Sequence, residues 1–312
     1  MKTNFNRTKS FLNNQKKTIF ILMKYAAIDI GTNAARLLIG EVVEGENPHI
    51  KKHAYTRVPL RLGFDVFSDG IIPESKVKAF TKSIKAFKLL AELYEVESIR
   101  ACATSAMREA KNSQEIKEFI KKETAIDIEI IDGEEEANLI FSTFFLLAVD
   151  KESSFVVIDV GGGSTEINYF NEGKKTARKS FQIGTIRLLK NQVDASALKE
   201  VKEWVDQNID LEKDFKVFAT GGNINKAHKI LGKLKSQPIE FRELRDFKEE
   251  VQSTSTEKLM DKYELKLDRA DVLPYACEIF FKAAKYLGKA ELYVPKIGLS
   301  DGIIYNQYLD RD

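Results

Sequence analysis

Two segments about 130 residues apart repeat one pattern of strand, turn and strand. The first reads YAAIDIGTNAARLLIGE over Tyr25–Glu41, and the second reads FVVIDVGGGSTEINYFN over Phe155–Asn171. Each pairs a β-rich apolar run ending in aspartate with a glycine-bearing turn and a second run. The pattern predicts two hairpins, each offering backbone N–H groups, hydroxyls and one carboxylate at a single point. Because successive N–H groups in such turns bind phosphate oxygens, two facing turns would clamp a phosphate.

The length of 312 residues predicts two domains of about 150 residues each, in agreement with the spacing of the repeat. We expect a first domain over 24–147 and a second over 148–312. The first 22 residues are rich in Asn, Lys and Thr, and the short apolar run that follows leads into the first strand, not to a cleavage site. Residues 1–23 are therefore expected to form a disordered extension, with Met23 as the candidate start of translation.

Composition excludes several kinds of partner. Lys and Arg total 49 against 47 Asp and Glu, so no whole-molecule positive field favours nucleic acid or an anionic membrane. No window approaches the roughly 18 consecutive apolar residues of a membrane span. Cys102 and Cys277 lie far apart in segments predicted to be buried, which is no disulfide framework. We expect a soluble cytoplasmic protein that binds neither nucleic acid nor membranes.

Strands and helices alternate along both halves, which predicts an α/β fold with ligand groups at the carboxyl ends of strands. Apolar residues at three- and four-residue spacing predict a helix over Glu74–Tyr94. A turn is expected over Phe64–Gly70 and a loop over Lys296–Gly302. In the second half, a strand over Phe215–Ala219 leads to a third glycine turn and a helix.

Three turns supply the candidate phosphate ligands, because they combine N–H and hydroxyl donors and the third opens a helix whose N-terminus favours anions. These are Gly31, Thr32 and Asn33 in the first turn, Gly161, Gly162, Gly163, Ser164 and Thr165 in the second, and Gly221, Gly222 and Asn223 in the third. Among the arginines, Arg36 and Arg108 lie closest to predicted turns and rank above Arg61, Arg187 and Arg269 as phosphate ligands.

The aspartates of the two hairpins, Asp29 and Asp159, occupy equivalent positions at strand ends. Such a pair can hold Mg²⁺ against substrate phosphates, since Mg²⁺ keeps several waters and few protein ligands. Each could instead bond its own turn backbone. Two copies in matched context favour the metal interpretation.

Glu135 has two readings of about equal weight. Asp132 is a candidate N-cap, and Glu135 stands at the capping-box position three residues on, so Glu134, Glu135 and Glu136 can simply offset the helix dipole. Alternatively, one of these carboxylates deprotonates an attacking water. Glu166, just after the second glycine turn, is the other candidate acid.

Four motifs follow one another along the chain: DIGTN at Asp29, DGEEEA at Asp132, DVGGGSTE at Asp159 and TGG at Thr220. In these motifs and their order, the sequence resembles the exopolyphosphatase and guanosine pentaphosphate phosphohydrolase family. The resemblance extends from Lys24 to about Tyr305. It implies two ribonuclease-H-like domains of the actin and sugar-kinase superfamily around a cleft, and Mg²⁺-dependent removal of a terminal phosphate from inorganic polyphosphate or guanosine pentaphosphate. A homodimer is compatible with the family.

By the resemblance, the catalytic glutamate falls on Glu135 and the glutamate closing the second phosphate motif on Glu166, while Asp29 and Asp159 match the carboxylates associated with metal and phosphate. Arg108 matches a family arginine. Two features depart from the family: Ala34 replaces a common serine, and GLSDG at Gly298–Gly302 replaces Gly-Leu-Arg-Glu-Gly. The C-terminal helical domains of longer members are also missing from this sequence.

These observations lead to a phosphoanhydride hydrolase as the first hypothesis. A catalytically weak protein that binds guanosine tetraphosphate or pentaphosphate and regulates a partner is the alternative, which the two departures permit. A small-molecule kinase of the same superfamily does not explain the DGEEEA segment. The sequence does not choose between polyphosphate and guanosine pentaphosphate, since both present a terminal phosphoanhydride.

Overall fold

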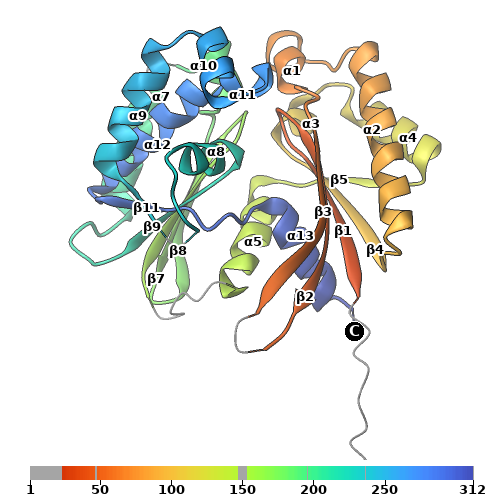
Figure 1. Cartoon of the computed structure of the whole chain (residues 1–312), viewed down its shortest axis with the longest axis horizontal. Coiled ribbons are helices and arrows are strands. Elements are labelled where there is room, and N and C mark those ends of the chain that lie inside the picture. Colours follow the sequence, from red (N-terminus) through yellow and green to blue (C-terminus); the bar gives the residue numbers. More distant parts are fainter. Residues whose placement is uncertain (1–22, 46–47, 147–152, 195, 236, 312) are drawn as a thin grey trace, which may run out of the picture.

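The computed structural model of this chain describes residues 23–45, 48–146, 153–194, 196–235 and 237–311. Met23 apart, the predicted N-terminal extension lies outside the described residues, and so does the predicted domain boundary between 147 and 148. The described residues form two sheets with helices on their outer sides and two helices between them (Figure 1).

The first sheet has the strand order β3-β2-β1-β4-β5, in which β1, β2 and β3 are antiparallel and β1, β4 and β5 are parallel. Its strands are β1 (Lys24–Ile30), β2 (Ala35–Val43), β3 (His49–Val58), β4 (Ser98–Ala103) and β5 (Ile128–Ile130). The helices of this half are α1 (Gly63–Asp69), α2 (Glu74–Leu93), α3 (Ser105–Glu109) and α4 (Ser113–Thr124). The apolar stripe of α2 packs Phe80, Ile84 and Phe87 against the sheet, as its spacing predicted.

The second sheet has the order β10-β11-β9-β6-β7-β8. Its strands are β6 (Phe155–Val160), β7 (Thr165–Asn171), β8 (Lys174–Phe181), β9 (Lys216–Thr220), β10 (Ile239–Glu240) and β11 (Glu291–Tyr293). The helices of this half are α6 (Thr185–Leu189), α7 (Ala197–Asn208), α8 (Gly222–Ile230), α9 (Phe241–Ser253), α10 (Thr256–Tyr263), α11 (Leu267–Ala270) and α12 (Leu273–Leu287). Strands β8-β7-β6-β9-β11 repeat the order and directions of the whole first sheet.

The predicted hairpins are confirmed, and their turns close alike. The amide of Gly31 donates to the carbonyl of Ala34 at 3.1 Å, and the amide of Gly161 donates to the carbonyl of Ser164 at 2.9 Å. Three antiparallel strands followed by two parallel ones, present twice, constitute the predicted pair of ribonuclease-H-like sheets. The predicted α/β fold is therefore confirmed.

Two predicted irregular segments are helical instead. The segment predicted as a turn over Phe64–Gly70 forms α1, because Val66 packs into the core and Gly70 ends the helix with φ +75°. The segment predicted as a loop over Lys296–Gly302 contains the start of α13 (Leu299–Leu309). There, Asp301 accepts a hydrogen bond from the amide of Gly298, which caps the helix.

Helices α5 (Gly133–Ser142) and α13 lie between the two sheets (Figure 1). A 3₁₀ turn, η1 (Thr143–Leu146), extends α5. One hydrophobic cluster joins residues of β1, β2, α5, β6, β7 and α13. The central helices therefore fix how the first sheet sits against the second, and with it the geometry of the space between the hairpin turns.

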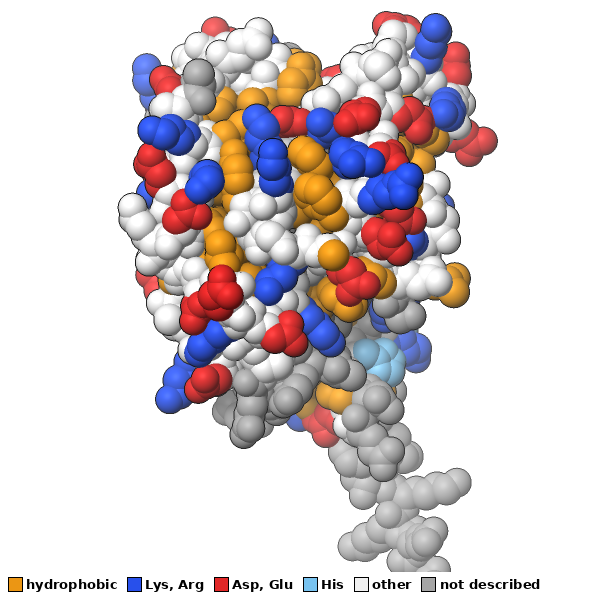
Figure 2. All heavy atoms as spheres, turned by 90° about the vertical axis from the view of Figure 1, so that its left-hand side faces the viewer, with side chains coloured by type: hydrophobic (Ala, Val, Ile, Leu, Met, Phe, Trp, Pro, Cys, Tyr) orange, Lys and Arg blue, Asp and Glu red, His pale blue; other side chains and the backbone are white. Residues whose placement is uncertain are grey.

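The surface agrees with the near-neutral composition. On the face that includes the outer helices of the second half, Lys and Arg side chains alternate with Asp and Glu (Figure 2). Within the described residues, none of the helices combines the length and apolarity that a bilayer crossing requires.

Gly302 tests the packing of α13 on α5. A Cβ at this position would overlap the carbonyl oxygen of Leu139, which is helix backbone and cannot move aside. We expect Gly302→Ala to destabilise the protein by about 3 kcal/mol in urea unfolding. Gly298→Ala, whose Cβ meets nothing within 4 Å, serves as the control and should cost about 1 kcal/mol or less. Equal stability losses would show that α13 can shift on α5.

Candidate active site

A cleft of about 760 Å³ opens between the two sheets, at the carboxyl ends of β1 and β6. It brings together most of the predicted site residues from segments far apart in the sequence. Those that line it are Asp29, Gly31, Thr32, Asn33, Arg36, Asp159, Gly161, Gly162, Ser164, Glu166, Gly221, Gly222 and Asn223. Four others, Arg108, Glu135, Gly163 and Thr165, are not among the residues that line the cleft.

The first two glycine turns touch each other across the cleft. The Thr32 side chain packs against Gly162, where a Cβ would lie 2.9 Å from the Thr32 Cβ. The Thr32 hydroxyl also shares a buried hydrogen bond of 2.6 Å with the Ser105 hydroxyl. Glycine is therefore required at 162 for the two turns to approach this closely.

Several predicted phosphate ligands already have protein partners. The Thr165 hydroxyl donates to the carbonyl of Ile183 at 2.5 Å, and the Asn33 amide donates to the carbonyl of Asp268 at 2.9 Å. Gly163 packs against Ser105, and its carbonyl accepts from Arg187 at 2.7 Å. These contacts hold the turns in place and occupy the Thr165 hydroxyl, the Asn33 amide and the Gly163 carbonyl.

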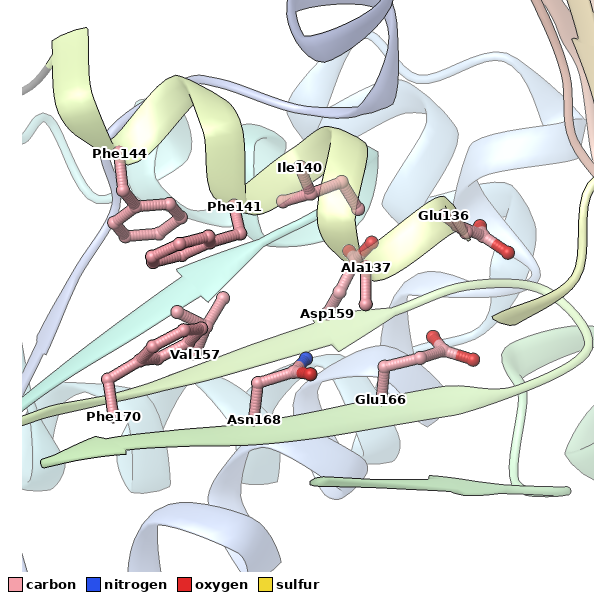
Figure 3. Close-up of a pocket in the computed structure, with 10 residues that line it drawn as sticks. All are labelled: Glu136, Ala137, Ile140, Phe141, Phe144, Val157, Asp159, Glu166, Asn168 and Phe170. Atoms are coloured by element: carbon pink, nitrogen blue, oxygen red, sulfur yellow. The ribbon is translucent and has the colours of Figure 1, made fainter. Parts of the chain in front are cut away.

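Three carboxylates converge at the floor of the cleft, each from a different element: half-buried Glu136 from α5, half-buried Asp159 from β6 and buried Glu166 from β7 (Figure 3). Asp159 and Glu166 stand directly opposite each other in the β6–β7 ladder. Burial raises the pKa of Asp159 to about 7, and the charge of Glu166 adds to the rise. Burial, followed by the charges of Glu166 and Asp159, also raises the pKa of Glu136 well above its ordinary value.

Glu166 is the best satisfied of the three acids. Burial raises the pKa of its carboxyl, while hydrogen bonds from Ser164 and Ser180 act in the opposite direction. The Ser180 hydroxyl lies 2.8 Å from Glu166 Oε1. Glu166 therefore has a fixed orientation, as expected for a residue that holds a ligand in place.

The structure does not bring Glu135 to the cleft. Its carboxylate pairs with Arg100 at 2.7 Å, and Arg100 also holds Glu129 at 2.7 Å. Asp132 caps the helix as predicted, accepting from the amides of Glu134 and Glu135 at 2.7 and 2.8 Å. The glutamate that faces Asp159 and Glu166 is the next one, Glu136, which the sequence interpretation passed over.

The two highest-ranked arginines take different positions. Arg36 lines the cleft and pairs with Asp29 at 2.7 Å, so it screens that carboxylate from its neighbours. Arg108 lies behind the cleft, where it donates to the carbonyl of Ile131 at 2.6 Å and approaches Glu136 to 3.4 Å. Arg108 can therefore orient Glu136.

Two arginines that the sequence did not rank highly as phosphate ligands, Arg57 and Arg269, also line the cleft. Arg269 donates to the carbonyl of Gly222 at 2.7 Å, and burial together with Arg57 and Arg36 lowers its pKa to about 10. Arg57, which the sequence interpretation missed, pairs with Asp268 at 2.6 Å. The sequence feature that could have identified Arg57 is its position near the end of β3, the strand that follows the first hairpin. Arg36, Arg57 and Arg269 thus place three guanidinium groups in the lining of the cleft.

The donor set at the floor of the cleft consists of carboxylate oxygens, which suit Mg²⁺. Within the part of the chain that the structure describes, no group of three or more His, Cys, Asp or Glu side chains is arranged to hold a metal ion. The residues therefore fit an ion held by one or two carboxylates, with waters and substrate oxygens completing the shell. Asp159 and Asp29 are the residues that could hold it.

Comparisons with known proteins agree with the fold. A bifunctional 3-dehydroquinate synthase/phosphatase from Fusobacterium nucleatum is 34% identical over 208 residues, which are 61% of this chain and 31% of that protein. Exopolyphosphatase 2 of Mycobacterium tuberculosis is 32% identical over 191 residues, 58% of this chain and 59% of that protein. This chain thus spans about a third to three fifths of the length of these relatives.

Solved structures match over nearly the whole chain. An exopolyphosphatase from Cytophaga hutchinsonii has a TM-score of 0.79 at 22% identity, and the family member from Aquifex aeolicus has a TM-score of 0.75 at 24% identity. Each match covers 93% of this chain and 99% of the other. The sequence model described as the Ppx/GppA phosphatase family matches residues 39–311. This chain belongs to the Ppx/GppA phosphatase family.

Proposed function

We propose that this protein hydrolyses a terminal phosphoanhydride bond and releases orthophosphate from inorganic polyphosphate, from guanosine pentaphosphate, or from both. The observation that carries the proposal is the convergence of Glu136, Asp159 and Glu166 beneath two facing glycine turns. Backbone amides of the turns would bind the terminal phosphate, and the carboxylates would handle a water and a metal ion.

In this proposal, Glu136 is the general base. Its carboxylate takes a proton from a water that attacks the terminal phosphorus, the bridging P–O bond breaks, and the shortened substrate departs with the bridging oxygen. A raised pKa makes Glu136 a stronger base once it is ionised. Arg108 holds the carboxylate from behind, and Glu166 keeps its own orientation through Ser180. Glu135 has no part in this step, because Arg100 engages it outside the cleft.

Mg²⁺ is the proposed cofactor, and Asp159 with Asp29 would hold it. When bound, the ion would neutralise negative charge on the phosphates. The charge of Glu166 raises the pKa of both Glu136 and Asp159, which is an unfavourable arrangement for the protein alone, and a divalent cation would offset this repulsion.

The rest of the substrate would lie along the outer cleft. Four lysines there form no ion pair among the residues that the structure describes, and they are Lys226, Lys229, Lys266 and Lys296. Unpaired ammonium groups favour the phosphates that follow the terminal one in polyphosphate, or the second pyrophosphate of guanosine pentaphosphate.

Glu136→Gln should lower the rate of phosphate release at least about 100-fold, because the amide accepts no proton from the attacking water. Glu135→Gln is the matched control, since it changes the same chemistry one residue away and loses only a surface ion pair. Malachite-green detection of orthophosphate with polyphosphate as substrate measures both. A larger loss of the rate of phosphate release in Glu135→Gln than in Glu136→Gln would show that Glu135 is the general base.

Asp159→Asn should stabilise the metal-free protein at pH 8 and not at pH 4. The folded-state pKa of about 7 lies above the ordinary value of 3.8, so folded Asp159 keeps its proton as the pH rises through this range while the unfolded chain loses it. Asp159 therefore does not reduce the free energy of unfolding below about pH 4, and this free energy falls by about 4 kcal/mol as the pH rises from there past 7. Asparagine carries no charge and avoids the loss.

Thermal unfolding in the presence of a chelator measures this effect. Added Mg²⁺ should then raise the melting temperature of the wild type at pH 8 by more than that of Asp159→Asn. The same pH dependence in both proteins would contradict the burial of an ionised Asp159.

The double substitution Lys226→Ala with Lys229→Ala should raise KM for long polyphosphate about three- to tenfold and leave triphosphate hydrolysis nearly unchanged. Lys199→Ala with Lys202→Ala on α7 removes the same charge from lysines that pair with acids on their own helix. Initial rates on triphosphate, long polyphosphate and guanosine pentaphosphate, with and without Mg²⁺, give both comparisons. Tight binding of guanosine tetraphosphate without phosphate release from any of the three would instead support a regulatory protein.

A further inference from the structure

A second, much smaller cavity lies beneath the acids. It has a volume of about 10 Å³ and runs between α5 and the β6–β7 hairpin (Figure 3). Its outer end is formed by the three carboxylates and its inner end by Phe141, Phe144 and Phe170. Asn168 lies where the two ends meet.

Asn168 is a polar residue at a strand position that favours an apolar one. Residues 166, 168 and 170 share the face of β7 that points toward α5, and their partners in β6 are Asp159, Val157 and Phe155. The side chains on this face change from charged to apolar along the hairpin, and Asn168 faces Val157. A valine would suit a buried strand position of this kind better than an amide.

The amide of Asn168 has no protein partner. The residue is only 7% exposed, and no hydrogen bond joins its side chain to another described residue; its amide atoms are not completely enclosed, since they border the cavity. Figure 3 shows the amide directed from β7 toward α5, into the cavity. Because a buried amide without a partner is unfavourable, a polar molecule in the cavity is the natural partner.

The cavity matches a single water. A volume of about 10 Å³ is at the lower limit for one water molecule, and such a water needs two or more polar partners. The Asn168 amide and the neighbouring carboxylates supply these, and a volume of about 10 Å³ leaves no room for a larger molecule.

We propose that Asn168 binds one water molecule in this cavity and through it adds to the contacts, from Arg108 to Glu136 and from Ser180 to Glu166, that orient these two carboxylates. Asn168 is then a positioning residue, one cavity away from the substrate. The inference rests on the proposed hydrolysis for its kinetic consequence, but the water site itself does not depend on any activity.

Asn168→Val and Asn168→Thr form the decisive pair, because the two side chains have nearly the same shape and only threonine carries a hydroxyl that can hold the water. We expect Asn168→Val to lower kcat about tenfold while KM stays within about twofold, since the substrate does not touch this residue. Asn168→Thr should keep kcat within about threefold of the wild type. Neither should lower the melting temperature by more than a few degrees, because valine and threonine both suit a buried strand position.

A crystal structure of each protein gives the second readout. The water should be present in the wild type and in Asn168→Thr and absent in Asn168→Val. Asn138→Ala, which removes an exposed amide bonded to Lys175 on the outside of α5, is the control and should leave kcat unchanged.

Three outcomes would overturn the inference: a dry cavity in the wild type, equal kcat for wild type and Asn168→Val, or equal losses in the valine and threonine variants. The proposed function fails differently, by the absence of phosphate release from the wild type on every substrate. In that case the crystallographic comparison alone still decides whether Asn168 binds a water.

Discussion

The rest of the site depends on the burial of like charges at directly opposed positions, Asp159 and Glu166, with Glu136 against them. Such a cluster repels itself, and the fold must hold it together by other means. Aromatic packing holds this region together. Phe141 stacks on Phe170 with 4.2 Å between ring centroids, and Phe155 stacks on Phe170 with 4.7 Å between centroids. These rings fasten α5 to the β6–β7 hairpin immediately behind the acids. The same contacts that place Glu136 therefore also desolvate it, which raises its pKa.

The cleft is equally a product of close backbone packing. Gly162 admits Thr32 of the opposite turn, and Gly302 admits the backbone of α5 at Leu139. The first contact brings the two glycine turns together, and the second packs α13 against the helix that carries Glu136. Because neither glycine can gain a side chain without moving one half of the protein relative to the other, the distance between the turns and the acids is set by these contacts.

The sequence predicted what local chemistry determines. The duplicated hairpins, the long helix α2 and the glycine turns follow from periodicity and turn residues, and all are confirmed. The choice between Glu135 and Glu136 depended on how α5 is rotated. Ile140 follows Glu136 by one turn and lines the inner cavity, whereas Leu139 follows Glu135 and lies against α13. That distinction needed knowledge of which sheet lies on which side of the helix. The lysines of the outer cleft could not be predicted either, because Lys266 and Lys296 line the same cleft only in the folded chain.

The two departures from the family pattern can be understood from their surroundings. Ala34 is completely buried, so a serine hydroxyl at this position would need a partner inside the protein. Asp301, in the GLSDG segment, accepts from the amide of Gly298 at 3.1 Å and pairs with Lys52 of β3 at 2.6 Å. The segment thus ties the first sheet to α13 at the edge of the cleft. An arginine missing from this segment removes one cation from the rim, while Lys52 and the unpaired Lys296 remain beside it. Lys52 and Lys296 therefore keep positive charge in the cleft beside this segment.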